Sequence, residues 1–147
     1  MILFSFLEFR ILLVTLMRTL PLDFVLSMVG YCFRVFYFPF DLGFLFTAGD
    51  QLTVEMHQQP ADRSCANQAI GGDHYGPINI YMAKVSDAAS AVGSSASWFK
   101  ISEMGLPSNN PDYWATEVLN DNCGHFTFTV PSNIAPGQYL LRAEVIG

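Results

Sequence analysis

Basic side chains are scarce in this sequence. Its 147 residues hold 7 Lys and Arg against 13 Asp and Glu, which gives a formal net charge of −6 at pH 7. Proteins that bind nucleic acid present clustered Lys and Arg to the phosphates, and no nucleotide, flavin or nucleic-acid motif is present either. We therefore expect no nucleic-acid partner, which leaves an acidic partner, a neutral polymer or a small molecule.

A second absence is that of a long, uninterrupted apolar run. The runs ILLVTLM and FVLSMVGYCF near the N-terminus are shorter than the roughly 20 apolar residues that a transmembrane helix needs. Arg10, Arg18, Asp23 and Arg34 separate these runs from one another and from their neighbours. We therefore expect no clean transmembrane helix and no membrane partner.

Charge and phenylalanine content divide the chain near Thr47–Asp50. Residues 1–47 contain ten of the thirteen Phe and no net charge, whereas residues 48–147 carry the whole charge of −6. A secretory signal needs a charged start, one apolar core and a small-residue cleavage site, but Glu8 and Arg10 interrupt the first apolar run. We interpret residues 1–47 as a mispredicted or non-native leader, because thymine-rich non-coding DNA encodes mostly Phe, Leu, Ile, Val and Met. A signal or anchor is the alternative. As a foreign leader, the segment is expected to share no core with the rest.

Residues 48–147 follow the period-two pattern of β-strands. In QLTVEMH, apolar side chains alternate with Thr53, Glu55 and His57, so we expect the apolar ones in the core and the polar ones outside. Similar patterns predict strands over residues 51–57, 77–85, 97–102, 125–131 and 138–146. Gly-, Pro- and Ser-rich loops separate the strands, and no helical period is visible. The fold class is therefore all-β, with a β-sandwich as the expected architecture.

From Ala48 to Ile146 the sequence resembles the central part of a fungal lytic polysaccharide monooxygenase of auxiliary activity family 9, formerly glycoside hydrolase family 61. The stretches that carry the resemblance occur in the family's order: AGDQLTVEMHQQPADRSCANQAIGGDHYGPINIYMAKV, SWFKISEMG, DYWATEVLNDNCG and FTVPSNIAPGQYLLRAEVI. The resemblance implies a secreted protein with an immunoglobulin-like sandwich. It also implies copper-dependent oxidative cleavage of cellulose or another β-glucan at C1 or C4 of the sugar, with an external electron donor.

The resemblance also assigns site residues. Family members hold one copper ion in a histidine brace, made by the amine and imidazole of an N-terminal histidine and the imidazole of an internal histidine in a His-x-Gly-Pro segment. That segment is His74-Tyr75-Gly76-Pro77 here, so His74 maps to the internal copper ligand, and imidazole is a ligand type that suits copper. Tyr75 would face the polysaccharide. Taken without the family, His74 would be a solvated or hydrogen-bonded turn residue, and Tyr75 would pack against the turn.

The other two histidines do not match family ligand positions. We expect His57 and His125 to be exposed polar residues at strand ends. The resemblance further implies an N-terminal histidine, a histidine beside the copper that does not bind it, a glutamine and an axial tyrosine, but the sequence as written starts at Met1 and stops at RAEVIG. We therefore expect an incomplete sandwich and an inactive fragment.

Two alternatives to the enzyme remain. The domain could be a non-catalytic polysaccharide-binding sandwich that uses Tyr75, Trp98, Tyr113 or Trp114, or a membrane-associated protein if residues 1–47 are genuine.

Three cysteines are present, two of them in the β-rich part. Secretion, which the resemblance implies, would place Cys65 and Cys123 in oxidising surroundings where a disulfide between them forms. Two separate thiols are the alternative, because sequence alone does not establish their geometry. Cys32 has no evident partner.

Overall fold

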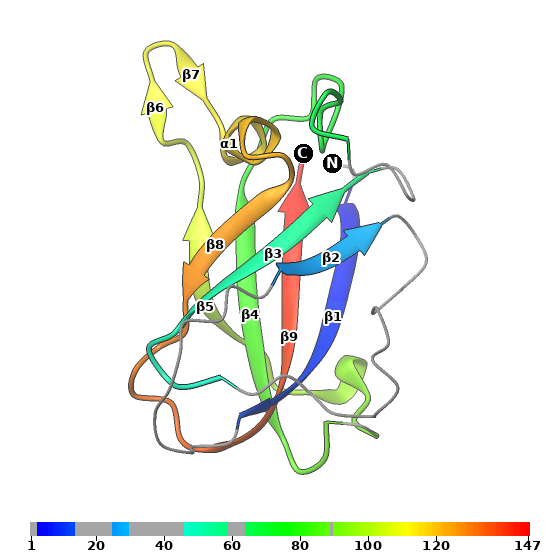
Figure 1. Cartoon of the computed structure of the whole chain (residues 1–147), viewed down its shortest axis with the longest axis vertical. Coiled ribbons are helices and arrows are strands. Elements are labelled where there is room, and N and C mark those ends of the chain that lie inside the picture. Colours follow the sequence, from blue (N-terminus) through cyan, green and yellow to red (C-terminus); the bar gives the residue numbers. More distant parts are fainter. Residues whose placement is uncertain (1–2, 14–24, 30–45, 59–63, 89) are drawn as a thin grey trace.

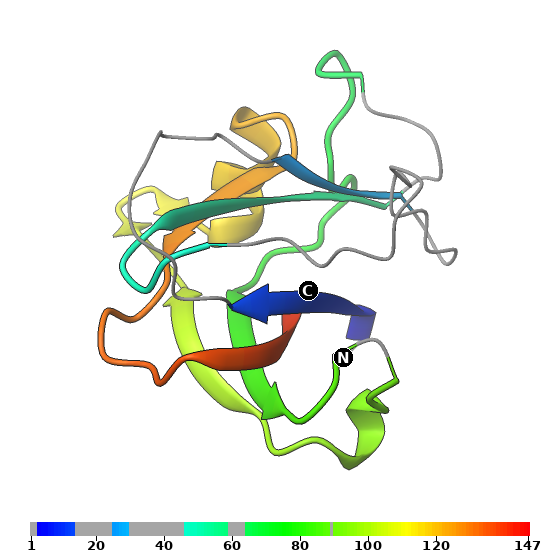
Figure 2. The same cartoon turned by 60° about the horizontal axis from the view of Figure 1, so that its bottom comes forward.

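The computed structural model describes residues 3–13, 25–29, 46–58, 64–88 and 90–147, the first two ranges as backbone strands. The strands form two layers, which overlap in Figure 1 and are separated in the view of Figure 2. The larger layer is a four-stranded sheet in the order β1 (Leu3–Leu13), β9 (Gly137–Ile146), β4 (Ile78–Val85) and β5 (Phe99–Met104). The smaller is a three-stranded sheet in the order β2 (Val25–Val29), β3 (Gln51–His57) and β8 (His125–Thr129). The predicted all-β sandwich is confirmed.

The predicted strands of the second half appear with small changes at their ends. β3, β4 and β8 lie within the predicted ranges, and β9 begins one residue earlier. β5 is shifted, because it starts at Phe99 rather than at Ser97. Trp98 belongs instead to the preceding loop, where its indole N–H donates a hydrogen bond to the carbonyl oxygen of Gly93 at 2.9 Å. Gly93–Ser95 form a short 3-10 helix, η1, in this loop.

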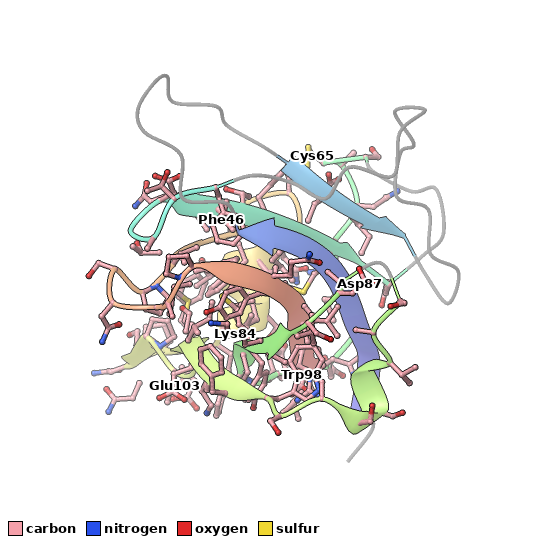
Figure 3. All side chains as sticks on the ribbon, turned by 90° about the horizontal axis from the view of Figure 1, so that it is seen from below. Phe46, Cys65, Lys84, Asp87, Trp98 and Glu103 are labelled. Carbon is pink, nitrogen blue, oxygen red and sulfur yellow. A yellow bond between two sulfur atoms is a disulfide. The ribbon has the colours of Figure 1, made fainter. Side chains whose placement is uncertain are left out.

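The first half of the chain contributes two outer strands. β1 pairs antiparallel with β9, and β2 pairs parallel with β3. Phe46 is 6% exposed and belongs to the same core cluster as the residues that follow it; Figure 3 shows it near the middle of the molecule. The expectation that residues 1–47 share no core with the rest is therefore wrong at Phe46. That the segment is mispredicted or non-native stays a prediction.

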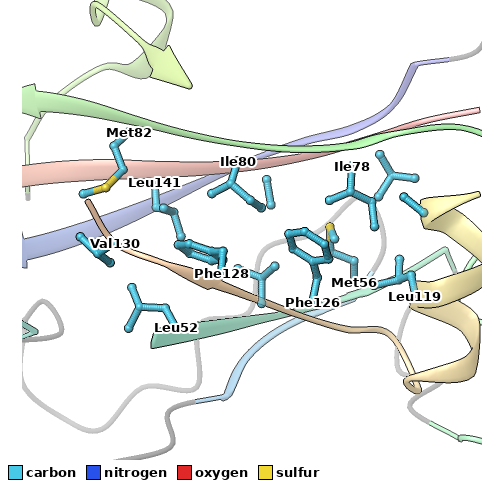
Figure 4. Close-up of a cluster of buried hydrophobic side chains, with 14 of the residues drawn as sticks. Leu52, Met56, Ile78, Ile80, Met82, Leu119, Phe126, Phe128, Val130 and Leu141 are labelled. Carbon is cyan, nitrogen blue, oxygen red and sulfur yellow. The ribbon is translucent and has the colours of Figure 1, made fainter. Parts of the chain in front are cut away.

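The core lies between the two sheets, as Figure 4 shows. Inward-facing side chains of β4 and β9 meet those of β3 and β8, and Leu119 closes one end. Burial of such apolar side chains supplies most of the driving force for folding. In the described part of the chain, the hydrophobic residues at 0% exposure are Val54, Ile78, Ile80, Met82, Ala83, Ala115, Leu119, Val130, Leu141 and Ala143.

One short helix, α1 (Ala115–Asp121), was not expected from the sequence. Seven residues make fewer than two turns, which is too few to show a helical period. The helix is held at its start by Glu117, whose carboxylate accepts a hydrogen bond from the backbone N–H of Trp114 at 2.6 Å. Before it, the hairpin of β6 (Ser108–Asn109) and β7 (Asp112–Tyr113) extends from the same end of the sandwich (Figure 1).

The outer face of β3 is more buried than the sequence pattern predicts. Glu55 is 1% exposed, and the His57 side chain, predicted to be exposed, is 4% exposed. The His57 imidazole donates from Nε2 to the Glu55 carboxylate at 3.0 Å, and His125 Nε2 lies 3.9 Å from the same carboxylate. A buried carboxylate needs such partners. His125 keeps the exposure expected of it in part, at 36%.

Within the described part of the chain, no helix combines the length and the apolar character that a membrane crossing requires.

Candidate functional site

His74 lies on the segment that leads into β4, which we call the His74 loop (residues 70–77). This loop, α1 and the end of β9 meet at one end of the sandwich (Figure 1). Two of its glycines are needed there. Gly72 has a φ of +80°, a conformation that side chains rarely adopt, and a Cβ on Gly76 would lie 1.9 Å from the carbonyl oxygen of Ile146. Gly72 thus allows the chain to turn, and Gly76 allows the backbone of the loop to lie close to the backbone at the end of β9.

His74 itself is partly exposed. A Cβ built on Gly72 would lie 3.5 Å from its Cδ2 atom, and one built on Gly147 would lie 3.0 Å from its Cβ atom. The histidine is therefore flanked by backbone without side chains on both sides. The N–H of Ile146 donates to the carbonyl oxygen of Pro77 at 3.1 Å, which ties the end of β9 to the loop. The result is an imidazole that reaches the surface from a loop in close contact with the sheet.

Three of the four aromatic residues considered for polysaccharide contact lie at this end. Tyr75, next to His74, is 51% exposed, and Tyr113 and Trp114 precede α1 and are partly exposed. The hydroxyl of Tyr113 donates to the Asp121 carboxylate at 2.5 Å. This hydrogen bond, together with desolvation and the nearby negative charge, raises the pKa of Tyr113 above its ordinary value of 10.0.

Trp98 lies elsewhere. It precedes Phe99, which pairs with Met82 toward the far end of β4 from Pro77. The guanidinium of Arg142 lies over the ring of Trp98, 4.5 Å from its centroid, and over the ring of Tyr81, 4.7 Å from its centroid. Trp98 is thus engaged in a cation–π contact on the outer face of the larger sheet and does not join the aromatic group beside His74.

The chemistry of the available donors tests the fit to copper. Among the described residues, no group of three or more His, Cys, Asp and Glu is gathered as a metal site. His57 and His125 both approach Glu55 rather than His74. A hollow of about 370 Å³ beside residues 66–69 is lined by His57 and Gln58, and His74 is not among its lining residues. These residues therefore provide one imidazole that suits copper and no complete coordination set.

The disulfide is present as the family resemblance implied. Cys65 and Cys123 are joined, with their Cα atoms 4.9 Å apart. Cys123 has a φ of 55° and Gly124 a φ of 78°, so the chain turns sharply between α1 and β8 at this point. Cys32 lies outside the described residues.

Sequence reasoning missed two polar residues of α1 that contact the His74 loop. Thr116 meets the backbone of Gly76, and Asn120 meets the backbone of Ile70. The two are four residues apart, which places them on the same side of a helix. That spacing becomes informative only once ATEVLND is known to be helical.

Comparison with known proteins gives a consistent result. The model of Auxiliary Activity family 9 (formerly GH61) matches residues 43–147. The AA9 family lytic polysaccharide monooxygenase AA9-X282 of Trametes coccinea is 78% identical over 98 residues, which are 67% of this chain and 36% of that protein. The protein of the same name from Coprinopsis cinerea is 67% identical over 98 residues, which are 67% of this chain and 28% of that protein. The chain thus spans about a third of the length of these curated relatives.

A solved structure supports the architecture. The protein named CvAA9A matches with a TM-score of 0.56 at 33% identity, covering 67% of this chain and 41% of the other. This likeness confirms the immunoglobulin-like β-sandwich that the sequence resemblance implied.

Proposed function

The chain belongs to Auxiliary Activity family 9, and from this we propose that it is the central part of a lytic polysaccharide monooxygenase. Its reaction would be the copper-dependent oxidative cleavage of cellulose or another β-glucan at C1 or C4, with electrons from an external donor. The observation that carries the proposal is His74: within a domain of this family, the histidine of the His-x-Gly-Pro segment reaches the surface on a loop closely packed against the sheet.

In this proposal each residue of the site has one task. His74 would offer its imidazole to the copper, and the family's remaining ligands, the amine and imidazole of an N-terminal histidine, would complete the brace. Copper bound there would supply the activation of O₂ or H₂O₂. Tyr75 stacks its exposed ring on the polysaccharide, because an aromatic face is an apolar surface that a sugar ring can cover. Neither task requires His57 or His125, whose imidazoles lie 3.0 Å and 3.9 Å from the carboxylate of Glu55.

The proposal includes secretion. The disulfide between Cys65 and Cys123 is typical of proteins that fold in an oxidising compartment. The acidic charge of residues 48–147 also suits a partner without phosphate groups, such as a neutral glucan.

A graft into an intact relative tests the function. Residues 48–146 should replace the matching part of the Trametes coccinea relative, so that the rest of its fold is supplied. We expect tight copper(II) binding by calorimetry and release of oxidised oligosaccharides from cellulose in the presence of a reductant. His74→Ala should remove both, since one of two imidazoles is lost. His125→Ala is the matched control and should retain both. Full activity of the His74→Ala graft would show that His74 is a turn residue without a role in copper binding.

For the 147-residue chain on its own, we expect weaker copper binding than for the graft. The described residues provide one family ligand, so we propose that the isolated chain is inactive and binds copper(II) no more tightly than an ordinary exposed histidine would. Calorimetry of the chain beside its His74→Ala variant checks this. Tight binding that His74→Ala leaves intact would point to a different copper site.

The second candidate is a non-catalytic polysaccharide-binding module. The exposure of Tyr75 at 51%, beside the partly exposed Tyr113 and Trp114, favours it. Co-sedimentation of the 147-residue chain with cellulose, compared with its Tyr75→Ala variant, tests the module without any copper. Retention that depends on Tyr75 would support binding, and retention unchanged by Tyr75→Ala would argue against a role for Tyr75.

A further inference from the structure

The chain from Cys65 to Gly76 is joined at three points, in reverse order, to the segment that comprises α1 and the turn after it. The disulfide joins Cys65 to Cys123. Hydrogen bonds then join Ile70 to Asn120 and Gly76 to Thr116. As the loop advances toward β4, its partners therefore step back along the helix toward its start.

The tie at Ile70 uses both polar groups of one backbone residue. The N–H of Ile70 donates to Asn120 Oδ1 at 2.8 Å, and Asn120 Nδ2 donates to the carbonyl oxygen of Ile70 at 2.9 Å. An amide side chain has one acceptor and one donor group, so Asn matches this pair and fixes the orientation of the peptide. The side chain of Ile70 is 4% exposed and lies in the core.

The tie at Gly76 is also reciprocal. The N–H of Gly76 donates to the hydroxyl oxygen of Thr116 at 3.3 Å, and the N–H of Thr116 donates to the carbonyl oxygen of Gly76 at 3.3 Å. Thr116 is 1% exposed, so its hydroxyl would lose hydrogen bonding if the loop moved away. Both ends of the loop are thus held by paired hydrogen bonds to residues on one side of α1.

The hydrogen bonds at Ile70 and at Gly76, which we call the two anchors, limit the path of residues 71–75 between them. The four residue steps from Thr116 to Asn120 advance about 6 Å along the helix axis, whereas the six steps from Ile70 to Gly76 could span roughly 20 Å if extended. Residues 71–75 therefore cannot run straight between these two points and must form an arch, and the positive φ of Gly72 lets the chain turn within it. His74 lies on the arch, and its position follows from where the two anchors stand.

We propose that Asn120 and Thr116 are positioning residues for His74, which hold the two ends of the arch so that the imidazole stays in one orientation beside Gly72 while the His74 backbone lies against Gly147. The metal role of His74 rests on the proposed function. The positioning itself is a property of the chain without metal.

The test uses the full 147-residue chain without copper. Hydrogen exchange of the amides of residues 71–76 and the NMR signals of the His74 ring are recorded for Asn120→Ala and Thr116→Val. We expect loop exchange to rise roughly tenfold or more, because buried hydrogen bonds are lost, and the His74 ring signals to shift. Amides in the middle of β4 should keep their rates, and Thr116→Ser, which retains the hydroxyl, should restore both readouts.

Asn122→Ala is the matched control. Asn122 also stands at the end of α1, and its Nδ2 donates to the carbonyl oxygen of Val118 at 2.9 Å without contacting the loop. Its removal should leave loop exchange and the His74 signals as they are. If Asn120→Ala does not fold, Asn120→Asp replaces it, since it retains the acceptor for the Ile70 N–H and lacks the donor for the carbonyl oxygen.

Two outcomes would overturn the positioning role. One is a loop exchange rate that Asn120→Ala raises no more than Asn122→Ala does. The other is an equal rise in β4, which would indicate general loss of stability. The function is judged separately, by His74→Ala in the graft: if that variant still binds copper while Asn120→Ala loosens the arch, the positioning stands and the copper role of His74 fails.

Discussion

The imidazole of His57 and the carboxylate of Glu55 form a buried hydrogen-bonded pair on the outer face of β3, with 3.0 Å between Nε2 and Oε1 and with the side chains 4% and 2% exposed. His125, the cross-strand partner of Glu55 on β8, stands 3.9 Å away from the same carboxylate. Two polar side chains on alternate positions of β3 thus hydrogen-bond to each other where the sequence pattern predicts exposure to water.

This pair predicts a stability loss in Glu55→Ala. The N–H of His57 would remain buried without its acceptor, which costs about 1–3 kcal/mol. Urea unfolding measures the change. Glu103→Ala is the control, because Glu103 bonds Lys100 at 2.6 Å but its side chain is 66% exposed, so the unfolding midpoint should barely move. Equal losses in the two variants would contradict a special role for the buried pair.

The disulfide predicts a redox-dependent stability. Its residues are 58 positions apart, and loss of a cross-link over such a loop costs about 2–4 kcal/mol. In a Cys32→Ala background, reductant should lower the unfolding midpoint, and Cys65→Ala should lower it equally and make it insensitive to reductant. A midpoint that reductant leaves unchanged would show that the disulfide contributes nothing to stability.

Gly76 predicts a steric requirement. A Cβ at this position would meet the carbonyl oxygen of Ile146 at 1.9 Å, and backbone cannot yield as the end of a flexible side chain can. Gly76→Ala should therefore destabilise the protein by at least about 1–3 kcal/mol. Gly105→Ala is the matched control, since nothing lies within 4 Å of its added Cβ. Thermal unfolding of both variants decides, and a Gly76→Ala variant as stable as Gly105→Ala would refute the close approach.

Tyr139 predicts a loss of stability at high pH. Burial raises the pKa of its phenol above the ordinary value of 10.0, so the folded protein favours the neutral form. This contribution is complete below about pH 10 and disappears as the pH rises through the folded-state pKa. Urea midpoints between pH 8 and pH 11 should therefore fall less steeply for Tyr139→Phe. That variant also loses the hydrogen bond to the carbonyl oxygen of Ala135, which lowers its stability at pH 8 by about 1 kcal/mol. Identical slopes would contradict the prediction.

Because β1 and β2 cover one edge of each sheet, we expect residues 48–147 alone to be prone to aggregate. β1 and β2 pair with β9 and β3, so their removal uncovers one edge of each sheet, and unpaired edges invite association. Light scattering should show larger particles for residues 48–147 than for the full chain. A soluble monomer with a cooperative thermal transition would show that these edges need no cover.

The strands of the second half could be predicted from the sequence because a half-buried strand has a local signature. In QLTVEMH and HFTFTVP, every second side chain is apolar, and each of these patterns became a strand of the smaller sheet. The cysteine pair and His74 came from the resemblance, since motif order along the chain is also a property of sequence. The disulfide is confirmed, and the copper role of His74 stays a prediction.

Other features depend on contacts between distant parts of the chain, which no local pattern contains. The burial of Glu55 and His57 requires cover on the outer face of β3, a face that the period-two rule predicts to be exposed to water. Asn120 meets Ile70 across 50 positions, and Thr116 meets Gly76 across 40, so neither could be assigned a partner before α1 was placed. Local periodicity therefore predicts which segments are strands, whereas packing determines which polar side chains are buried and what holds His74.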